Sequence, residues 1–372
     1  MSNRLLIFSL IALSFPLTTF FFFNEIKSYF EINISPVGQV IQIPDLDISQ
    51  PSYTLVPQSK AKILFVGDVL LARNVEFLLH TKGFDYSLKN TSAIFKDADF
   101  VVGNFESAIL KNHKQTPSFV TTFSVDAKFL PLLPKAKFTH FSLANNHALD
   151  YGQETFNNTQ TKLNETGLSA FGHPQFVSST SVTVIDIGEY SVGILALNEV
   201  FSTLVWDDIL TQLESLVNVS DYQIVYIHWG EEYTLRHNQK QELLAKKLID
   251  NGVDAIIGHH PHVTQDIEVY NNKPIFYSLG NFLFDQYFSV DVQQGLAVTL
   301  HISTSSVEYE LVPVSSEGAR SQPYKMSTDQ ASIFLANLAR RSSGDYVQNI
   351  KNGKLILPLS LATSSESVII AQ

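Results

Sequence analysis

The sequence predicts a layered α/β domain behind a single N-terminal transmembrane helix. From Lys62 onward, apolar strand-like runs alternate with segments that repeat apolar residues at helical spacing, and this alternation is typical of layered α/β domains. Residues 5–23 contain no charged side chain and match the length of a helix that spans a bilayer. With 372 residues, the chain can form one large domain or two of ordinary size.

The first 60 residues are interpreted as a membrane anchor and a spacer. The apolar stretch within residues 1–23 ends in four consecutive phenylalanines, where a signal peptide would carry small residues before its cleavage site, so we expect an uncleaved anchor. Arg4 precedes the stretch, which predicts a cytoplasmic N-terminus and a single-pass protein of the cell membrane whose bulk is extracytoplasmic. Residues 24–60 contain four prolines and no sustained periodicity, and they predict an extended linker.

The domain itself is predicted over residues 61–317, followed by a C-terminal helix and tail at residues 318–372. Its strands are apolar runs, and its helices are segments such as residues 238–250, in which leucines lie one turn apart. The sequence from Ser342 onward is weakly patterned. Strands are predicted at residues 62–68, 99–106, 138–147, 181–188, 190–198, 222–230, 254–262 and 273–281, with a final pair at 295–303 and 307–314. Helices are predicted at residues 153–166, 207–218, 238–250 and 327–341.

Composition excludes several classes of function. The formal net charge of −11 argues against a nucleic-acid partner, because binding to phosphate backbones depends on lysine and arginine. The absence of cysteine excludes disulfides, zinc–thiolate sites and a cysteine nucleophile. A small phosphorylated or carboxylated substrate stays compatible with the charge if a metal or a local cluster of cations binds it.

Five of the predicted strands end in polar residues that suit metal or phosphate chemistry. In open α/β sheets the carboxyl ends of the strands form the ligand crevice, so motifs spread over about 200 residues can converge. At one of these ends, an extended backbone would direct His260 and His262 to one side and His259 to the other. The five ends are Gly67-Asp68, Asn104-Phe105-Glu106, Asn145-Asn146-His147, His228-Trp229-Gly230 and His260-Pro261-His262.

Each motif taken alone also has a structural explanation. Asp68 could cap a helix or turn, Glu106 could form a surface ion pair, and Asn146 could belong to an Asx turn. His228 could be a core histidine bonded to a carbonyl group. Together, however, two carboxylates, an amide and three imidazoles form a mixed oxygen and nitrogen ligand set, which suits Mn, Fe or Zn better than Ca or Mg.

This ligand set predicts a centre of one or two divalent transition-metal ions. Two such ions could clamp a phosphoryl group and activate a water molecule, which is the chemistry of ester hydrolysis. His147, next to the amide ligand, could protonate the leaving oxygen, and Asp150 could fix the tautomer of His147.

The five motifs, in this order, resemble those of the CapA family of capsule biosynthesis proteins, known from poly-gamma-glutamate synthesis. The matching pieces are FVGDVLLAR, GNFESAI, SLANNHALDYG, IHWGEEY, IGHHPHV and YSLGNFLFDQ, across residues 62–286. That family is similar in turn to calcineurin-like metallophosphoesterases, which implies a sandwich of two mixed sheets flanked by helices. The resemblance implies a phosphoester-activating histidine at His147 and metal ligands at Asp68, Glu106, Asn146, His228, His260 and His262.

Two positions depart from the wider phosphatase pattern. Leu70 stands where that pattern has a histidine two residues after the first aspartate, so occupancy by two metals stays open. Glu106 replaces the usual aspartate of the second motif and is one methylene longer.

Further polar residues near the motifs are candidates for the rim of the crevice. Arg73, five residues beyond the first aspartate, could bind the anionic group of a substrate, and an exposed arginine without a ligand is the alternative. Asn281 is the second candidate for substrate binding, and Asp285 could line the same rim. His237 and His259 are expected to be bystanders.

Two functions from different classes follow, and they are compatible. In the first, the protein is a membrane-anchored, extracytoplasmic accessory component of capsule synthesis, whose crevice binds a metal and an anionic polymer and which works with other polymer-synthesis subunits. In the second, it is an extracytoplasmic metal-dependent hydrolase of a phosphoester or of the polymer. A non-catalytic structural anchored domain is the third alternative. The resemblance favours the first as a biological role, and His147 with Asp150 favours the second as chemistry.

Overall fold

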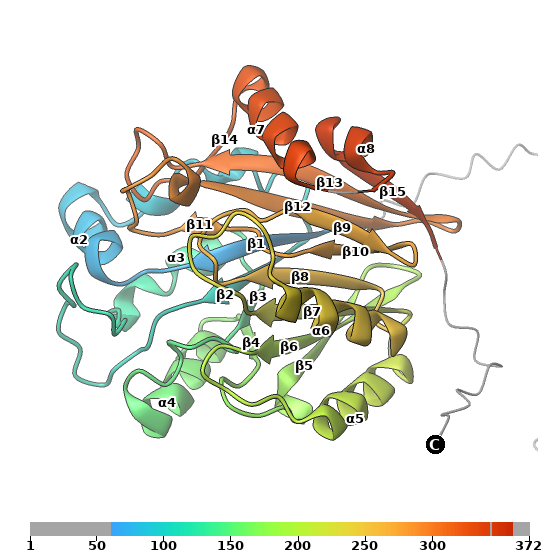
Figure 1. Cartoon of the computed structure of the whole chain (residues 1–372). Coiled ribbons are helices and arrows are strands. Elements are labelled where there is room, and N and C mark those ends of the chain that lie inside the picture. The colour runs from blue at the N-terminus through green and yellow to red at the C-terminus, as the bar shows by residue number, and fades with distance from the viewer. Residues whose placement is uncertain (1–60, 343, 360–372) are drawn as a thin grey trace, which may run out of the picture. The chain divides into compact units, whose positions relative to one another are not determined.

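The structure, a computed structural model, describes residues 61–342 and 344–359 (Figure 1). The predicted anchor at residues 1–23, the predicted linker at 24–60 and the end of the predicted tail lie outside the described residues. Within the described ranges, no helix is both long and apolar enough to span a bilayer.

Two mixed β-sheets lie face to face at the centre of the domain (Figure 1), which confirms the predicted two-sheet α/β architecture. The core between them combines side chains from both sheets, such as Phe65 and Val298 from one and Ile194 and Ile257 from the other. The first sheet has the order β14 (Tyr324–Lys325), β13 (Ser306–Ser315), β12 (Gln294–Ile302), β1 (Ile63–Val69), β2 (Phe100–Phe105), β3 (His140–Ser142) and β4 (Ser169–Phe171), with β11 (Asn281–Leu283) beside β1 and β15 (Lys354–Pro358) beside β13. The second has the order β5 (Val182–Asp186), β6 (Ser191–Asn198), β7 (Tyr222–His228), β8 (Ala255–His259), β10 (Lys273–Phe276) and β9 (Ile267–Tyr270).

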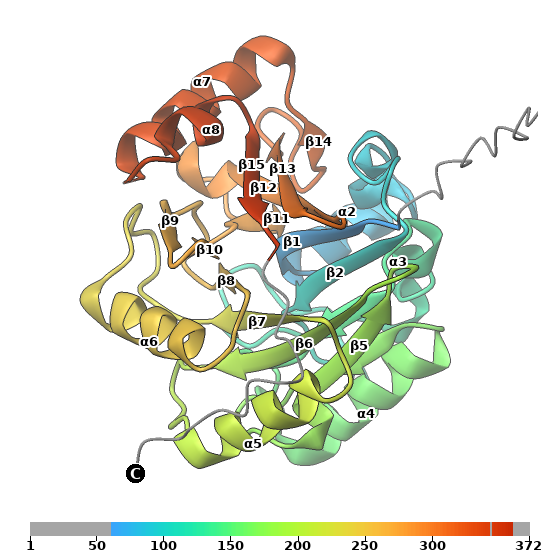
Figure 2. The same cartoon turned by 90° about the vertical axis from the view of Figure 1, so that its right-hand side faces the viewer.

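Helices cover the outer faces of both sheets, as Figure 2 shows for α5 and α6 on the second sheet. In contrast, α7 packs into the core cluster that the two sheets share. The sequence begins two of them with a capping box, in which Asn238 and Gln241 close the start of α6, and Ser327 and Gln330 close the start of α7. The helices are α2 (Arg73–Lys82), α3 (Leu132–Lys135), α4 (Gly152–Glu165), α5 (Trp206–Val217), α6 (Gln239–Asp250), α7 (Thr328–Arg341) and α8 (Val347–Lys351).

The end of the described chain departs from the expectation of a weakly patterned tail after Ser342. α8 packs there, and β15 pairs antiparallel with β13 over five residues. Leu355 and Leu357 alternate with exposed residues in β15 and are buried in the main core. A five-residue alternation is too short to identify a strand from sequence alone. Its pairing partner lies about 50 residues earlier in the chain, so no local hairpin pattern identifies it either.

Both ends of the described domain lie at the same end of the strands of the first sheet. β1 begins at Ile63, and its pairing with antiparallel β12 places Ile63 opposite Leu300. β13 returns antiparallel to β12, and β15 ends at Pro358 opposite Ser306. Residue 61 and residue 359 therefore lie at the end of the sheet that is opposite the carboxyl ends of β1 and β2.

Gly67 permits a close backbone contact that holds the end of β1. A Cβ atom at this position would lie 1.8 Å from the carbonyl oxygen of Gly280, and the next residue, Asp68, donates its N–H to that same oxygen at 3.2 Å. The neighbour is backbone and cannot rotate away. We expect Gly67→Ala to lower the free energy of unfolding by about 3 kcal/mol, as overpacked cores do, and to displace Asp68.

Urea denaturation measures this loss, with Gly188→Ala as the control. Gly188 has a positive φ of 87° but open space around it, so that variant should cost only about 1 kcal/mol, the strain of an L-residue in the left-handed region. Equal losses for the two variants would contradict the steric explanation.

Candidate functional site

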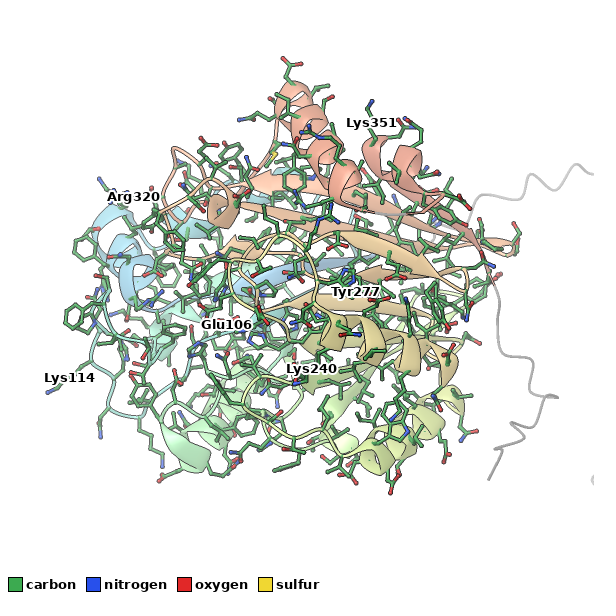
Figure 3. All side chains as sticks on the ribbon, in the orientation of Figure 1. Glu106, Lys114, Lys240, Tyr277, Arg320 and Lys351 are labelled. Atoms are coloured by element: carbon green, nitrogen blue, oxygen red, sulfur yellow. The ribbon has the colours of Figure 1, made fainter. Side chains whose placement is uncertain are left out.

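Side chains from four strand ends meet in the interior of the domain, where Figure 3 places the labelled Glu106. Asp68 belongs to β1, Asn104 to β2, His228 ends β7 and His259 ends β8. These side chains and Glu106 are fully buried. The sheet register brings polar groups to both sides of Asp68, because its strand pairs place Asn104 on one side and Asn281 on the other.

Asp68 is the centre of the cluster. Its Oδ1 accepts a hydrogen bond from Asn104 Nδ2 at 2.9 Å, and the same Nδ2 donates to Glu106 Oε1 at 2.8 Å. Its Oδ2 lies 3.1 Å from His262 Nδ1 and accepts the backbone N–H of His260 at 3.3 Å. A cluster in which two buried carboxylates lie this close needs positive charge or protons to be stable.

The imidazoles of β7 and β8 complete the cluster. His228 Nδ1 lies 2.8 Å from His259 Nδ1, and His228 Nε2 lies 2.9 Å from Asn146 Oδ1. Two sets of three ligand atoms each fall within 4.8 Å of one another, and both include Asp68. They are Asp68, His228 and His259, and Asp68, Glu106 and His262.

The buried groups differ in charge. Burial raises the pKa of Asp68, but the hydrogen bond and charge of His262 outweigh burial and hold that pKa well below its usual range. Burial and the neighbouring charge of Asp68 raise the pKa of Glu106 well above its usual range. Burial lowers the pKa of His259 and His260 to about 3, so both imidazoles are neutral near pH 7 and can offer a lone pair to a metal.

The residues present fit a divalent cation. Glu106 Oε2 and His259 Nε2 are buried and have no hydrogen-bond partner among the described residues. Unpaired buried polar atoms are costly, and a cation held by Glu106 and Asp68, which belong to one ligand set, would supply Glu106 Oε2 with a partner and balance the charge. Carboxylate and imidazole ligands without thiolates suit the transition metals of the predicted set, although the geometry does not select one metal.

The three buried imidazoles predict that the metal-free protein loses stability in acid. Burial lowers the pKa of His228, His259 and His260 below the 6.5 of an unfolded chain, so unfolding takes up protons below that pH. Burial also lowers the pKa of His113, His140 and His173. Burial raises the pKa of Glu76, Glu106 and Asp254, which act in the opposite direction but are fewer. We expect the free energy of unfolding to fall by at least about 1.4 kcal/mol per pH unit, the effect of one net proton, from pH 6.5 towards pH 4.5. Urea denaturation in chelator measures it, and a constant or rising value towards acid contradicts the assignment.

The backbone after β8 corrects the expectation for its three histidines. The chain was expected to stay extended through His262, but the strand ends at His259, and φ is +99° at His260 and +59° at His262. Side chains therefore do not alternate there, and His259, expected to be a bystander, lies in the cluster. The ring of His260 lies with its centroid 4.5 Å from that of His228.

His147 and Asp150 form the expected pair beside the cluster. His147 Nδ1 lies 3.1 Å from Asp150 Oδ2, which also accepts the N–H of Phe123 at 2.8 Å. The ring of Phe123 stacks on His147 with the centroids 4.0 Å apart. Nε2 of His147 makes no hydrogen bond within the described ranges, so the structure holds the ring by one nitrogen and leaves the other available.

The two candidate substrate-binding residues already have partners in the protein. Arg73 forms an ion pair with Asp285 through two N–H groups and donates a third hydrogen bond to Val120 O. Asn281 Oδ1 lies 2.9 Å from His262 Nδ1, and its Nδ2 donates to Val292 O at 3.0 Å. Substrate binding by either residue stays a prediction.

Two asparagines of the cluster were not among the predicted site residues. Asn104 contacts both carboxylates, and Asn145 Nδ2 donates to Asn104 Oδ1 and to Phe105 O, each at 2.9 Å. Both stand within the predicted motifs, and the signal for them was a polar residue at the buried end of an apolar run. His237, expected to be a bystander, pairs with Asp266 and stacks on Tyr277 instead of joining the cluster.

The fold and the site define a class of protein: two-sheet α/β proteins with a buried carboxylate and imidazole centre at the strand ends. Residues 62–286 match the family described as bacterial capsule synthesis protein PGA_cap. The chain belongs to this family.

Curated relatives agree with the family. The chain is 31% identical over 309 residues to PGA biosynthesis protein CapA of Bacillus subtilis, covering 78% of this chain and 80% of that protein. It is 30% identical over 324 residues to capsule biosynthesis protein CapA of Bacillus anthracis, covering 81% and 78%.

Similarity to solved structures is distant. A phosphatase from Mycoplasma pneumoniae is 14% identical with a TM-score of 0.39, and the match covers 72% of this chain and 93% of that chain. Sulfate thiohydrolase SoxB of Thermus thermophilus is 11% identical with a TM-score of 0.41, covering 77% and 62%.

Proposed function

We propose that this protein acts in the synthesis of a capsule or envelope polymer of the poly-glutamate type, as a membrane-anchored, extracytoplasmic component. The observation that carries the proposal is the family match over residues 62–286, supported by relatives whose names refer to PGA and capsule biosynthesis. Membrane attachment is assigned to residues 1–23. The crevice is assigned to a metal and to an anionic group of the polymer or its precursor, and other polymer-synthesis subunits are the expected partners.

Deletion of the gene in the source organism tests this role. We expect the amount of envelope polymer to fall, and to be restored by the full chain but not by the Asp68→Asn variant. A variant that lacks residues 1–23 should leave the membrane fraction. Unchanged polymer after deletion contradicts the role, whereas unchanged fractionation contradicts only the anchor.

A hydrolytic activity of the same crevice is the second candidate function, and the contact between His147 and Asp150 favours it. A bound divalent cation would supply Lewis acidity and a water of lowered pKa, with Asp68, Glu106 and the neighbouring imidazoles holding it. Asp150 and Phe123 fix the ring of His147 so that Nε2 can give a proton to a leaving oxygen. A purely structural site has no use for such a group.

Purified residues 60–372 with Mn²⁺ and an aryl phosphodiester test the hydrolase. We expect His147→Ala to lower kcat by at least about 100-fold, the usual contribution of a general acid, and Asp150→Asn to lower it by about 10-fold or more, as an outer partner does. His80→Ala, on the partly exposed face of α2, is the matched histidine control. Equal activity of the wild type and His147→Ala would contradict the proposed hydrolytic activity and would not affect the proposed accessory role.

A further inference from the structure

Hydrogen bonds fix the orientation of the Asn104 side chain. The backbone N–H of His147 can only donate, and it bonds Asn145 Oδ1 at 3.1 Å. Asn145 Nδ2 is thereby directed to Phe105 O, which can only accept, and to Asn104 Oδ1. Asn104 therefore presents its NH₂ group to the cluster and directs its oxygen away.

The NH₂ group of Asn104 lies where one of two ions would have to bind. It contacts Asp68 Oδ1 at 2.9 Å, Glu106 Oε1 at 2.8 Å and His228 Nδ1 at 3.3 Å. Asp68 and His228 are two of the three residues in the ligand set that also contains His259. A metal needs ligand atoms at about 2.0 to 2.2 Å, so it can enter this set only if the amide leaves.

The other set includes His262, whose Nδ1 makes no contact with Asn104 in the described ranges and faces two oxygen atoms. Asn281 Nδ2 donates to Val292 O, so its Oδ1 is the atom that lies 2.9 Å from His262 Nδ1. Asp68 Oδ2 lies 3.1 Å from the same nitrogen, and Glu106 Oε2 is buried with no partner in the described ranges. Oxygen atoms that converge on an imidazole nitrogen are stable together when a proton or a cation lies between them.

Charge balance agrees with one ion. The cluster contains two carboxylates, Asp68 and Glu106, and its other members are amides and imidazoles. One divalent cation neutralises the two carboxylates. A second would leave uncompensated positive charge in a fully buried site, which is costly.

We infer that the centre holds a single divalent cation, bound by Asp68, Glu106, His262 and Asn281, while the Asn104 amide occupies the position of a second ion. This rests on the proposed metal centre and adds its stoichiometry and its ligands. Asn281 thereby becomes a metal ligand rather than a substrate-binding residue.

Metal counting on the full chain tests the inference. The protein is stripped with chelator, titrated with Mn²⁺ and studied by calorimetry, elemental analysis and electron paramagnetic resonance. We expect one ion per chain and the spectrum of an isolated Mn²⁺. Two ions per chain, or a spin-coupled spectrum, overturn the inference while leaving the metal centre intact. No bound ion contradicts the metal centre itself, and the inference with it.

Variants separate the two ligand sets without any assay of activity. We expect His262→Ala and Asn281→Ala to weaken Mn²⁺ binding at least about 10-fold, and His259→Ala to keep one ion with an affinity within about threefold of the wild type. Asn104→Asp, which replaces the amide by a carboxylate, should raise the stoichiometry to two. Thermal melts check the folding of each variant. Loss of the ion in His259→Ala together with its retention in His262→Ala overturns the assignment.

Discussion

Replacement of Asp68 by asparagine is expected to abolish high-affinity cation binding. Asp68 belongs to both sets of ligand atoms, and its two oxygens face Asn104 on one side and His262 on the other. The variant keeps the volume of the side chain but removes the charge, and it directs an NH₂ group at N–H donors that now bond a carboxylate. We expect the Kd for Mn²⁺ to rise at least about 100-fold, which corresponds to about 2.7 kcal/mol.

Calorimetry and the metal-induced shift of Tm measure this effect. With free Mn²⁺ at 100 times the Kd of the wild type, the wild type should gain about 2.7 kcal/mol of stability from the ion. At the same concentration, Asp68→Asn should gain almost none. Asp97→Asn, at an exposed position outside the crevice, is the matched control. Binding by Asp68→Asn within threefold of the wild type would exclude a centre at this residue.

Removal of β15 is expected to lower the free energy of unfolding of the domain by a large fraction. A chain that ends at Asn352 lacks the five residues that pair with β13 and exposes the core around Leu355 and Leu357. Each leucine contributes about 2 kcal/mol by burial, and the lost strand pairing adds to this. The expected total of about 5 kcal/mol compares with a stability of about 5 to 15 kcal/mol for a whole domain.

Urea denaturation of two truncated chains measures the contribution of β15. The control ends at residue 359, keeps β15 and should match the full chain. A chain ending at Asn352 that unfolds at the same urea concentration as the control would contradict a structural role for β15.

The strand ends were predictable because each follows an apolar run whose burial on both faces leaves few alternatives to a central strand. The same reasoning reached Asp68, Glu106 and His228, which the structure brings together. It failed at His259 because a strand's alternation holds only while the backbone stays extended, and the positive φ of His260 is a tertiary property. Short or distant pairings, as in β15, leave no periodicity in the sequence to detect.

The amide residues show a second limit of prediction. Ligand chemistry directs attention to acids and imidazoles, so the asparagines within the same motifs received less weight. In the structure, Asn104 lies between Asp68 and Glu106, and Asn145 sets which atom Asn104 presents. Such a chain of donors and acceptors depends on exact distances across two strands, and no spacing in the sequence encodes it.

The position of both ends of the described domain, at the end of the strands opposite the cluster, has a practical consequence. β1 runs for seven residues, about 20 Å, from the vicinity of residue 61 to Asp68, and β15 ends at Pro358 on the same side as Ile63. A biosensor chip, a fluorescent fusion or a lipid vesicle coupled through either end would attach far from the cluster. Immobilised protein should therefore bind Mn²⁺ in solution with the affinity of the free protein, whichever end carries the linker.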